Sequence, residues 1–294
     1  MSSATSLTSE EKIVPEQEWT AIVTSKKPLF HVPVRELWAY RDMIMLMIRR
    51  DIIATFKQTI LGPLWFIIQP VISSVVFTII FSDIGRIPTN GIPPFLFYLS
   101  GNLIWYYFSA CLTSTSQTFR ANASLFNRVY FPRLAVPLAH LAVNFWSLAI
   151  QAIIFLCFYV YFYWSGAELF PSYRIVIIPA LIIQSALLGL GVGCLISALT
   201  TRYRDLQIAV APGIQLWMYA SCVFYPLSIV PEPWQSLMAF NPVVPLIEAF
   251  RFSLMGQGQV EIWQWLISLA MTLVLLVVGL VEFSRAERTM ADTI

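Results

Sequence analysis

The sequence predicts an all-α polytopic membrane protein with an N-terminal amphipathic interface helix, six transmembrane helices and short re-entrant helices between spans five and six. The chain is 58% hydrophobic and only 12% charged, whereas soluble domains are about 25% charged. It also contains six charge-free runs, each long enough for the roughly 20 apolar residues that span a bilayer. The runs are Gln58–Ser82, Ile87–Phe119, Leu134–Ala167, Ile175–Thr201, Leu206–Pro231 and Ile262–Val281.

Two segments precede these runs. Residues 1–33 are polar and interrupted by prolines, which is typical of a loosely ordered cytoplasmic lead. Residues 34–57 show helical periodicity with charges at both ends, so this segment should lie in the headgroup plane. Arg41 and Asp51 fall in its apolar sector, where pairing across helices and snorkelling are both open. The apolar face comprises Leu37, Tyr40, Ile44, Ile48 and Ile52, and the charged face Arg35, Asp42, Arg49, Arg50 and Lys57.

The first run contains two prolines with different expected effects. Pro63 follows Gly62 at its start, where proline fits the first turn of a helix. Pro70 lies inside the run and should bend the helix, because the carbonyl one turn earlier loses its usual N–H partner. A bent span beside a basic surface segment indicates a moving part of a transporter. A bent span that only packs is equally compatible with these residues.

The basic residues indicate the orientation. Fifteen of the 18 lysines and arginines lie in the N-terminal segment, the 118–134 loop, the 202–205 turn or the tail at 285–294. The positive-inside rule therefore predicts that both termini are cytoplasmic. The other three are Arg86, Arg174 and Arg251.

The connection from Tyr225 to Glu261 is apolar but repeatedly broken by proline. Neither half can form a straight span, so the sequence predicts two short helices within residues 227–258 that dip back from the external side. Glu248 and Arg251 stand one helical turn apart, where they can offset each other's charge. A surface loop resting on the membrane is the alternative. The prolines are Pro226, Pro231, Pro233, Pro242 and Pro245.

Two cytoplasmic connections mix basic and apolar residues. The 118–134 loop combines arginines with aromatic and aliphatic side chains, a composition suited to a groove on another protein. A positive-inside loop with aromatic membrane anchors has the same composition. The turn at 200–205 either contacts the same partner or marks the membrane boundary. The candidate contact residues are Arg120, Phe126, Arg128, Tyr130, Phe131, Arg133, Arg202 and Arg204.

Aromatic residues recur on the expected helix faces inside the membrane. Their rings can stack on the C–H faces of sugars, while hydroxyls and amides bind polar edges, so these residues are candidates for a glycan path. Helix packing and interface belts compete with this interpretation at every position. The candidates are Phe66, Phe77 and Phe81 in the first run, Tyr98 and Trp105 in the second, and Tyr219 in the fifth.

Missing side chains argue against several activities. No Gly-x-x-x-x-Gly-Lys-[Ser/Thr] loop is present, so an ATP-driven pump would need its ATPase on another polypeptide. No acidic or basic residue lies mid-span, which argues against ion-coupled transport and against an intramembrane hydrolase. No His and Cys spacing predicts a metal site. We therefore expect no catalytic residue, metal or cofactor on this chain, and no nucleic-acid partner.

Four stretches carry a family resemblance: RRDIIATFKQTILGPLWFIIQP, PPFLFYLSGNLIWYYFS, ANASLFNRVYFPR and NPVVPLIEAFRF. In this order they resemble the membrane subunit of type-2 ABC exporters for lipid-linked polysaccharides, the O-antigen and capsule export permeases. The resemblance extends from about Leu37 to the end of the chain. It makes residues 58–284 the six-span transmembrane domain.

The resemblance implies a permease of the cytoplasmic (inner) membrane that exports a lipid-linked polysaccharide. It implies a homodimer among membrane lipids, bound to two copies of a separate ATPase that holds ATP and Mg. The 118–134 loop becomes the coupling helix on that ATPase, and the 200–205 turn a secondary contact. The external gate residues become Pro242, Glu248 and Arg251. A type-2 exporter of teichoic acid, glycolipid or drug, and a membrane-bound assembly protein, are the alternatives.

Overall fold

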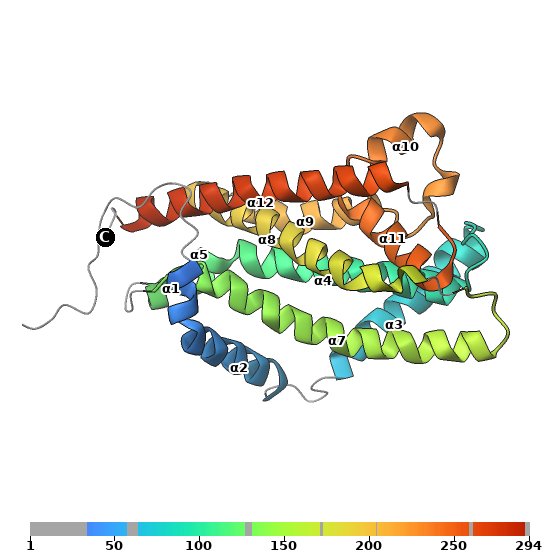
Figure 1. Cartoon of the computed structure of the whole chain (residues 1–294), viewed down its shortest axis with the longest axis horizontal. Coiled ribbons are helices and arrows are strands. Elements are labelled where there is room, and N and C mark those ends of the chain that lie inside the picture. Colours follow the sequence, from blue (N-terminus) through green and yellow to red (C-terminus); the bar gives the residue numbers. More distant parts are fainter. Residues whose placement is uncertain are drawn as a thin grey trace, which may run out of the picture. The chain divides into compact units, whose positions relative to one another are not determined.

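The computed structural model describes residues 34–57, 64–126, 131–170, 173–203, 205–258 and 261–291, and the regular secondary structure within them is helical (Figure 1). Among these residues, five helical segments are long and apolar enough to cross a membrane. The predicted all-α polytopic membrane fold is thereby confirmed. The five are α3 (Trp65–Phe77) with its π-helical continuation η2 (Thr78–Ile84), α4 (Pro94–Ser116), α7 (Ala135–Trp164), η3 (Tyr173–Ile177) with α8 (Ile178–Arg202), and α12 (Ile262–Ala291).

The segment before the first span forms two helices, α1 (Val34–Ala39) and α2 (Arg41–Lys57), which are separated at Tyr40. One face packs on the beginning of α7 and on the chain just before it, where Leu37 and Met47 are buried. The opposite face exposes 70% of Trp38 and 67% of Leu46. A helix pair with protein on one side and exposed apolar side chains on the other suits the headgroup plane.

The two charged residues in the apolar sector of this segment pair with their sequence neighbours. Arg41 Nε lies 3.7 Å from Asp42 Oδ1, and Arg50 Nε donates to Asp51 Oδ1 at 2.8 Å. The Arg41 guanidinium also lies 5.5 Å from the centroid of the Trp38 ring. Pairing along the same helix, rather than across helices, therefore accounts for both residues. Exposed pairs of this kind contribute at most about 1 kcal/mol.

The first span runs through Pro70 and changes to π-helical geometry at Thr78. Hydroxyl groups after the proline donate back to the helix: Ser74 Oγ to Pro70 O at 2.7 Å, and Thr78 Oγ1 to Ser74 O at 2.8 Å. Such bonds compete with the regular backbone ladder and loosen it locally. The irregular part of this span is therefore about two turns beyond the proline. Gly62 and Pro63 lie outside the described residues.

The predicted fifth span is shorter than expected. Its helix α9 (Leu206–Tyr219) has 14 residues, which is about 21 Å at 1.5 Å per residue. The helix ends because the chain turns at Cys222, whose φ is +54°, and continues through Pro226 into the 3₁₀ helix η4 (Leu227–Ile229). In the described part of the chain, the predicted six spans are therefore five long helices and this short one.

Two short helices follow, as predicted: α10 (Glu232–Met238) and α11 (Val243–Met255), whose axes differ by 100°. Most side chains of α11 are buried, and the helix packs against α4, α8 and α12. This burial excludes a loop that rests on the membrane surface. Figure 1 shows α11 at one end of the long helices and the short helix α5 (Thr118–Ala121) at the other.

Helices α8 and α12 approach each other closely at Gly191 and Gly279. A methyl group on Gly279 would overlap the carbonyl oxygen of Gly191, and one on Gly191 would lie 2.6 Å from Leu276 Cα. Small residues allow this approach, which supplies packing where the lipid provides no hydrophobic drive for helix association. On the same two helices, Gln184 Nε2 donates to Ser268 Oγ at 2.9 Å.

Replacing Gly279 by alanine should destabilise the protein in detergent by roughly 1–3 kcal/mol, because the methyl group must push two backbones apart. Thermal unfolding of the purified protein measures the loss. Gly213→Ala is the matched control, since a Cβ at this α9 position meets no atom within 4 Å. The control should be neutral or slightly stabilising, because alanine favours a helix over glycine. Equal losses in the two variants would contradict the close-contact argument.

Candidate functional site

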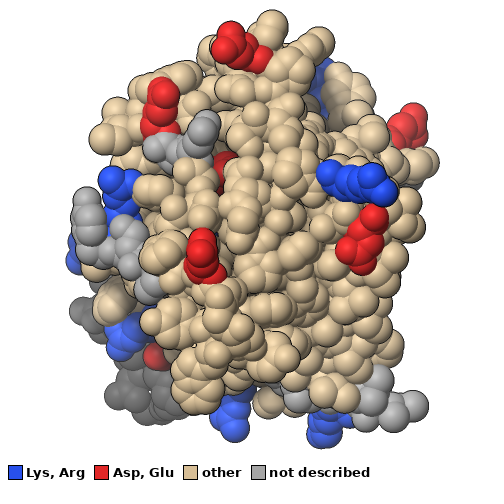
Figure 2. All heavy atoms as spheres, turned by 90° about the vertical axis from the view of Figure 1, so that its right-hand side faces the viewer, with Lys and Arg blue, Asp and Glu red and all other residues tan. Residues whose placement is uncertain are grey.

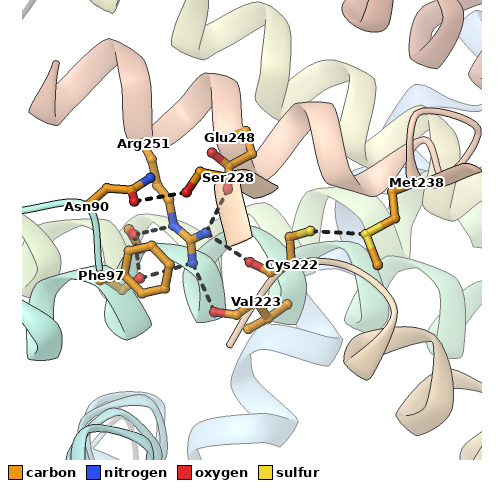
Figure 3. Close-up of polar contacts among 9 residues, drawn as sticks. Asn90, Phe97, Cys222, Val223, Ser228, Met238, Glu248 and Arg251 are labelled. Carbon is orange, nitrogen blue, oxygen red and sulfur yellow. Dashed lines mark hydrogen bonds and ion pairs between the residues drawn. The ribbon is translucent and has the colours of Figure 1, made fainter. Parts of the chain in front are cut away.

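A buried ion pair on α11 organises the end of the bundle at which this helix lies (Figure 3). Arg251 Nη1 lies 3.1 Å from Glu248 Oε1, and the two side chains are 1% and 3% exposed. The spacing of three residues places both on one face of the helix. Glu248 and Arg251, two of the three gate candidates, therefore form the pair that their spacing predicts.

The Arg251 guanidinium also binds two segments outside its own helix. Nη1 donates to Cys222 O and Nη2 to Val223 O, both at 2.9 Å, in the turn that follows α9. On α4, Nη2 donates to Phe97 O at 3.3 Å and Nε to Ser100 Oγ at 3.4 Å. The guanidinium carbon lies 3.6 Å from the centroid of the Phe97 ring, a cation–π contact. We call Glu248, Arg251 and these partners the Arg251 hub.

The hub depends on a glycine of α4. A Cβ at Gly101 would lie 2.6 Å from Arg251 Nη2 and 3.1 Å from Val223 O. Any larger residue there would displace the guanidinium from its acceptors. The packing role of this glycine could not be predicted without the position of Arg251.

Asn241, immediately before α11, holds the same turn from another side. Its Nδ2 donates to Ala220 O at 2.8 Å, and its Oδ1 accepts from Val243 N at 3.2 Å. The neighbouring gate candidate Pro242 accepts from Ser268 Oγ of α12 through its carbonyl oxygen at 2.6 Å. Sequence reasoning missed Asn241, although an Asn-Pro step before an apolar run is a signal for a helix start.

Two further contacts fasten this region (Figure 3). Ser228 Oγ donates to Asn90 Oδ1 at 3.0 Å, joining η4 to the connection before α4. Cys222 Sγ lies 3.7 Å from Met238 Sδ at the end of α10. Polar contacts therefore join parts of the stretch from Cys222 to Met255 to one another, and they hold this stretch against α4 and α12.

Three of the predicted path residues meet around the ring of Phe224, and a fourth, Tyr98, contacts two of those three. The centroid of the Phe224 ring lies 4.7 Å from Phe77, 4.9 Å from Phe81 and 5.4 Å from Tyr219. Tyr98 completes the group, 6.2 Å from Phe81. Phe224 and Tyr98 are buried, whereas half of Tyr219 is exposed. We call these five residues the aromatic cluster; Phe224 was missed because it lies in the turn and belongs to no helical stripe.

The other two path candidates lie elsewhere. Trp105 is 2% exposed and packs between Phe108 and Trp217, with ring centroids at 5.4 and 6.5 Å. Its large apolar ring therefore fills the core of this chain, and in this structure it does not face a path. Phe66 borders a cavity between α3, α4 and α7.

The 118–134 loop is attached to the helices around it. It contains α5 and α6 (Ala123–Phe126). Arg120 Nη1 donates to Gln207 Oε1 of α9, and Arg133 Nη1 donates to Glu287 O of α12 at 3.2 Å. The Arg133 guanidinium also lies 5.3 Å from the Phe126 ring.

Phe131, a docking candidate, is 4% exposed and belongs to the apolar cluster with Leu37 and Met47. Its ring stabilises the loop against the surface helices instead of facing a partner. Arg202 lies over the ring of its neighbour Tyr203, at 5.4 Å. The remaining three candidates, Arg128, Tyr130 and Arg204, lie outside the described residues.

Figure 2 shows the end of the bundle that carries α10 and α11. Uncharged atoms cover most of this face, and the acidic and basic side chains on it are scattered, with one of each sign side by side on the right. The described atoms of this view form no large patch of one sign.

Comparisons with known proteins agree with this architecture. The profile of the ABC-2 type transporter family matches residues 43–255. The chain is 28% identical over 222 residues to the O-antigen export system permease protein RfbA of Myxococcus xanthus, covering 74% of this chain and 82% of that protein. It is 26% identical to the protein of the same name from Klebsiella pneumoniae, covering 85% and 94%. It is also 26% identical to the polysialic acid transport protein KpsM of Escherichia coli, covering 82% and 92%. This chain is a multi-pass membrane protein that belongs to the ABC-2 type transporter family.

Proposed function

We propose that this chain is the permease subunit of an ABC exporter that moves a lipid-linked polysaccharide, of O-antigen or capsule type, across the cytoplasmic membrane. The observation that carries the proposal is similarity along 82–94% of the length of relatives named for O-antigen export or polysialic acid transport. Tyr219, the half-exposed member of the aromatic cluster, adds physical support, because a ring with a phenolic hydroxyl suits a sugar chain.

The energy comes from a separate ABC ATPase, because this chain has no phosphate-binding loop. ATP and Mg²⁺ bind to that subunit, and the 118–134 loop is its docking surface. Arg120 is exposed, and its charge is accessible for docking although Nη1 donates to Gln207 of α9, whereas Arg133 and Phe131 attach the loop to α12 and to the surface helices. A push on the loop is therefore passed to those helices.

Two copies of the chain, each with one ATPase, enclose the glycan path. α9 has few contacts within its own chain: Met218 is its only buried residue, and Ile208 is 80% exposed. α3 buries only Pro70 and Ser74. We place the contact between subunits along these two helices, which also carry members of the aromatic cluster. ATP-driven motion then opens the path beside α3, while the Arg251 hub holds α11 against α4 and against the turn after α9.

Deleting the chain in its source organism tests the function. Surface polysaccharide should disappear, lipid-linked glycan should accumulate inside, and a plasmid copy should restore export. A protein with the Arg120→Glu substitution should insert normally into the membrane. Less ATPase should co-purify with it, because the substitution reverses an exposed charge at the docking surface. Normal surface polysaccharide in the deletion strain would overturn the function.

Topology is tested with cysteines on exposed acidic positions at opposite ends. Asp42 has a 93% exposed side chain, and Glu232 is exposed on α10. With Cys157, the exposed native thiol, replaced by alanine, Glu232→Cys should react with a membrane-impermeant maleimide in intact cells. Asp42→Cys should react only after permeabilisation, because the positive-inside rule places that segment in the cytoplasm. The reverse pattern would invert the orientation.

A further inference from the structure

A cavity lined by both polar and apolar side chains lies between three helices of the bundle, away from the aromatic cluster and the Arg251 hub. It has a volume of about 340 Å³, is open on one side and is bordered by α3, α4 and α7, three helices that contact one another. This size falls within the range of small-molecule pockets, about 300–1,000 Å³. Figure 1 shows the three helices together. Its lining comes from the first turns of α3, the second half of α4 and the first half of α7.

Each helix presents polar residues to this cavity at helical spacing. α7 contributes Asn144, Ser147 and Gln151, and α4 contributes Tyr106 and Thr113. Spacings of three, four and seven residues place such side chains on one helix face. Polar residues thus converge from separate helices in a segment where hydrocarbon would otherwise penalise them.

Some of these polar groups bind one another, and others do not. Asn144 Nδ2 donates to Ser114 Oγ at 3.0 Å, and Tyr106 OH donates to Ser73 Oγ at 3.1 Å. The carboxamides of Gln69 and Gln151 also line the cavity, and no described residue forms a hydrogen bond with either. Gln69 is exposed and Gln151 is half-buried, and on membrane-spanning helices a carboxamide that meets hydrocarbon without a partner is penalised. Two of them facing one cavity indicate a binding role.

The side chains that line the cavity limit the class of ligand that can bind there. None of the described lining side chains is charged, so the cavity has no cation to neutralise a phosphate or carboxylate. Carboxamides and hydroxyls can donate and accept at once, which matches hydroxyl groups. The Phe66 ring borders the same space and offers a face for C–H stacking. A neutral, hydroxyl-rich ligand fits all of these features.

We propose that this cavity binds a sugar residue of the transported glycolipid. The inference rests on the proposed function, and it adds a glycan site within one subunit, formed by α3, α4 and α7. The cavity lies in the half of α4 that leads into α5, so the site is on the cytoplasmic side of the bundle in the proposed orientation. A sugar held there sits beside the span that the ATPase is proposed to move.

Photo-crosslinking in intact, glycan-producing cells tests the site directly. p-Benzoylphenylalanine is placed at Gln151 on α7 or at Gln69 on α3, and the irradiated protein is purified in detergent. Periodate staining detects attached glycan, and mass spectrometry identifies attached phospholipid. The matched control carries the crosslinker at Ile153, which is 62% exposed on α7, a helix outside the proposed contact between subunits. We expect glycan conjugates from positions 151 and 69 and only phospholipid from position 153.

Leucine variants separate a binding role from a packing role. Gln151→Leu and Gln69→Leu remove carboxamides that have no hydrogen-bond partner among the described residues, so thermal stability should stay unchanged or rise. Export should fall by roughly three- to tenfold for each hydrogen bond to sugar that is lost. Gln184→Leu is the matched control: it breaks the bond to Ser268 and should reduce stability.

The outcomes are distinct. Phospholipid alone at positions 151 and 69 would assign the cavity to a lipid headgroup and overturn the sugar site. Glycan yields at these positions equal to that at 153, or stability loss in Gln151→Leu matching Gln184→Leu, would overturn the site altogether. Either result would leave the proposed function intact, because that function fails only if the deletion strain still exports glycan.

Discussion

Replacing Arg251 by methionine should destabilise the protein by about 3–5 kcal/mol, because it leaves Glu248 buried without its cation. The substitution also removes the donors for the carbonyl oxygens of Cys222, Val223 and Phe97. Glu248→Gln should cost less, since glutamine can still accept from the guanidinium. Arg251→Lys should resemble the methionine variant, because an ammonium group cannot reproduce the planar fork. Thermal unfolding in detergent measures these losses.

The chain contains a matched control for this experiment. Arg285 and Glu282 form an ion pair with the same residue types and the same spacing, but their side chains are 56% and 36% exposed. Arg285→Met should therefore change stability by no more than about 1 kcal/mol. Similar losses of stability at Arg251 and Arg285 would contradict the conclusion that the Arg251 hub stabilises the position of α11.

The second large effect concerns the aromatic cluster. Phe224→Ala should cost about 3–5 kcal/mol, because the buried ring touches three others. Tyr219→Ala should cost much less, since half of this side chain is exposed. If the cluster contacts the glycan, Phe77→Leu and Tyr219→Leu should impair export while preserving stability, because leucine keeps bulk but lacks a flat face. Export assays and thermal unfolding on the same preparations separate the two effects.

Phe155 supplies the control for these substitutions. It is 1% exposed and packs on Tyr159 and Phe250, away from the cluster. Phe155→Leu should reduce stability about as much as Phe224→Leu, yet leave export normal in the protein that remains folded. Wild-type export in the Phe77→Leu and Tyr219→Leu variants would contradict a role in the glycan path and would show that these rings only pack against other residues.

Local patterns predicted much of this architecture. Long charge-free runs are sufficient for helices in a bilayer, because every backbone group must be satisfied within its own segment. Proline spacing likewise predicted the short helices before α12. The charge-free run predicted too long a helix at α9, because apolar residues continue past Tyr219 while the backbone turns at Cys222. Hydropathy measures composition and does not detect such a turn.

The functional residues divide in the same way. The pairing of Glu248 with Arg251 follows from a spacing of one helical turn, which is a local property. The carbonyl acceptors of Arg251, the clearance at Gly101 and the convergence on Phe224 join segments that are distant in sequence. The same holds for the burial of Trp105 and Phe131, which the sequence marked as contact residues.

By itself, the sequence determined the helical membrane fold and the number of long apolar runs, since these depend on composition and on short-range periodicity; the side of each charged loop stays a prediction. Only the tertiary structure decided which aromatic rings meet, which carbonyls the buried arginine binds and which carboxamides face the cavity between α3, α4 and α7. Helix faces can be predicted from 3.6-residue periodicity. Which faces oppose one another depends on close packing among helices, and no single helix encodes that arrangement.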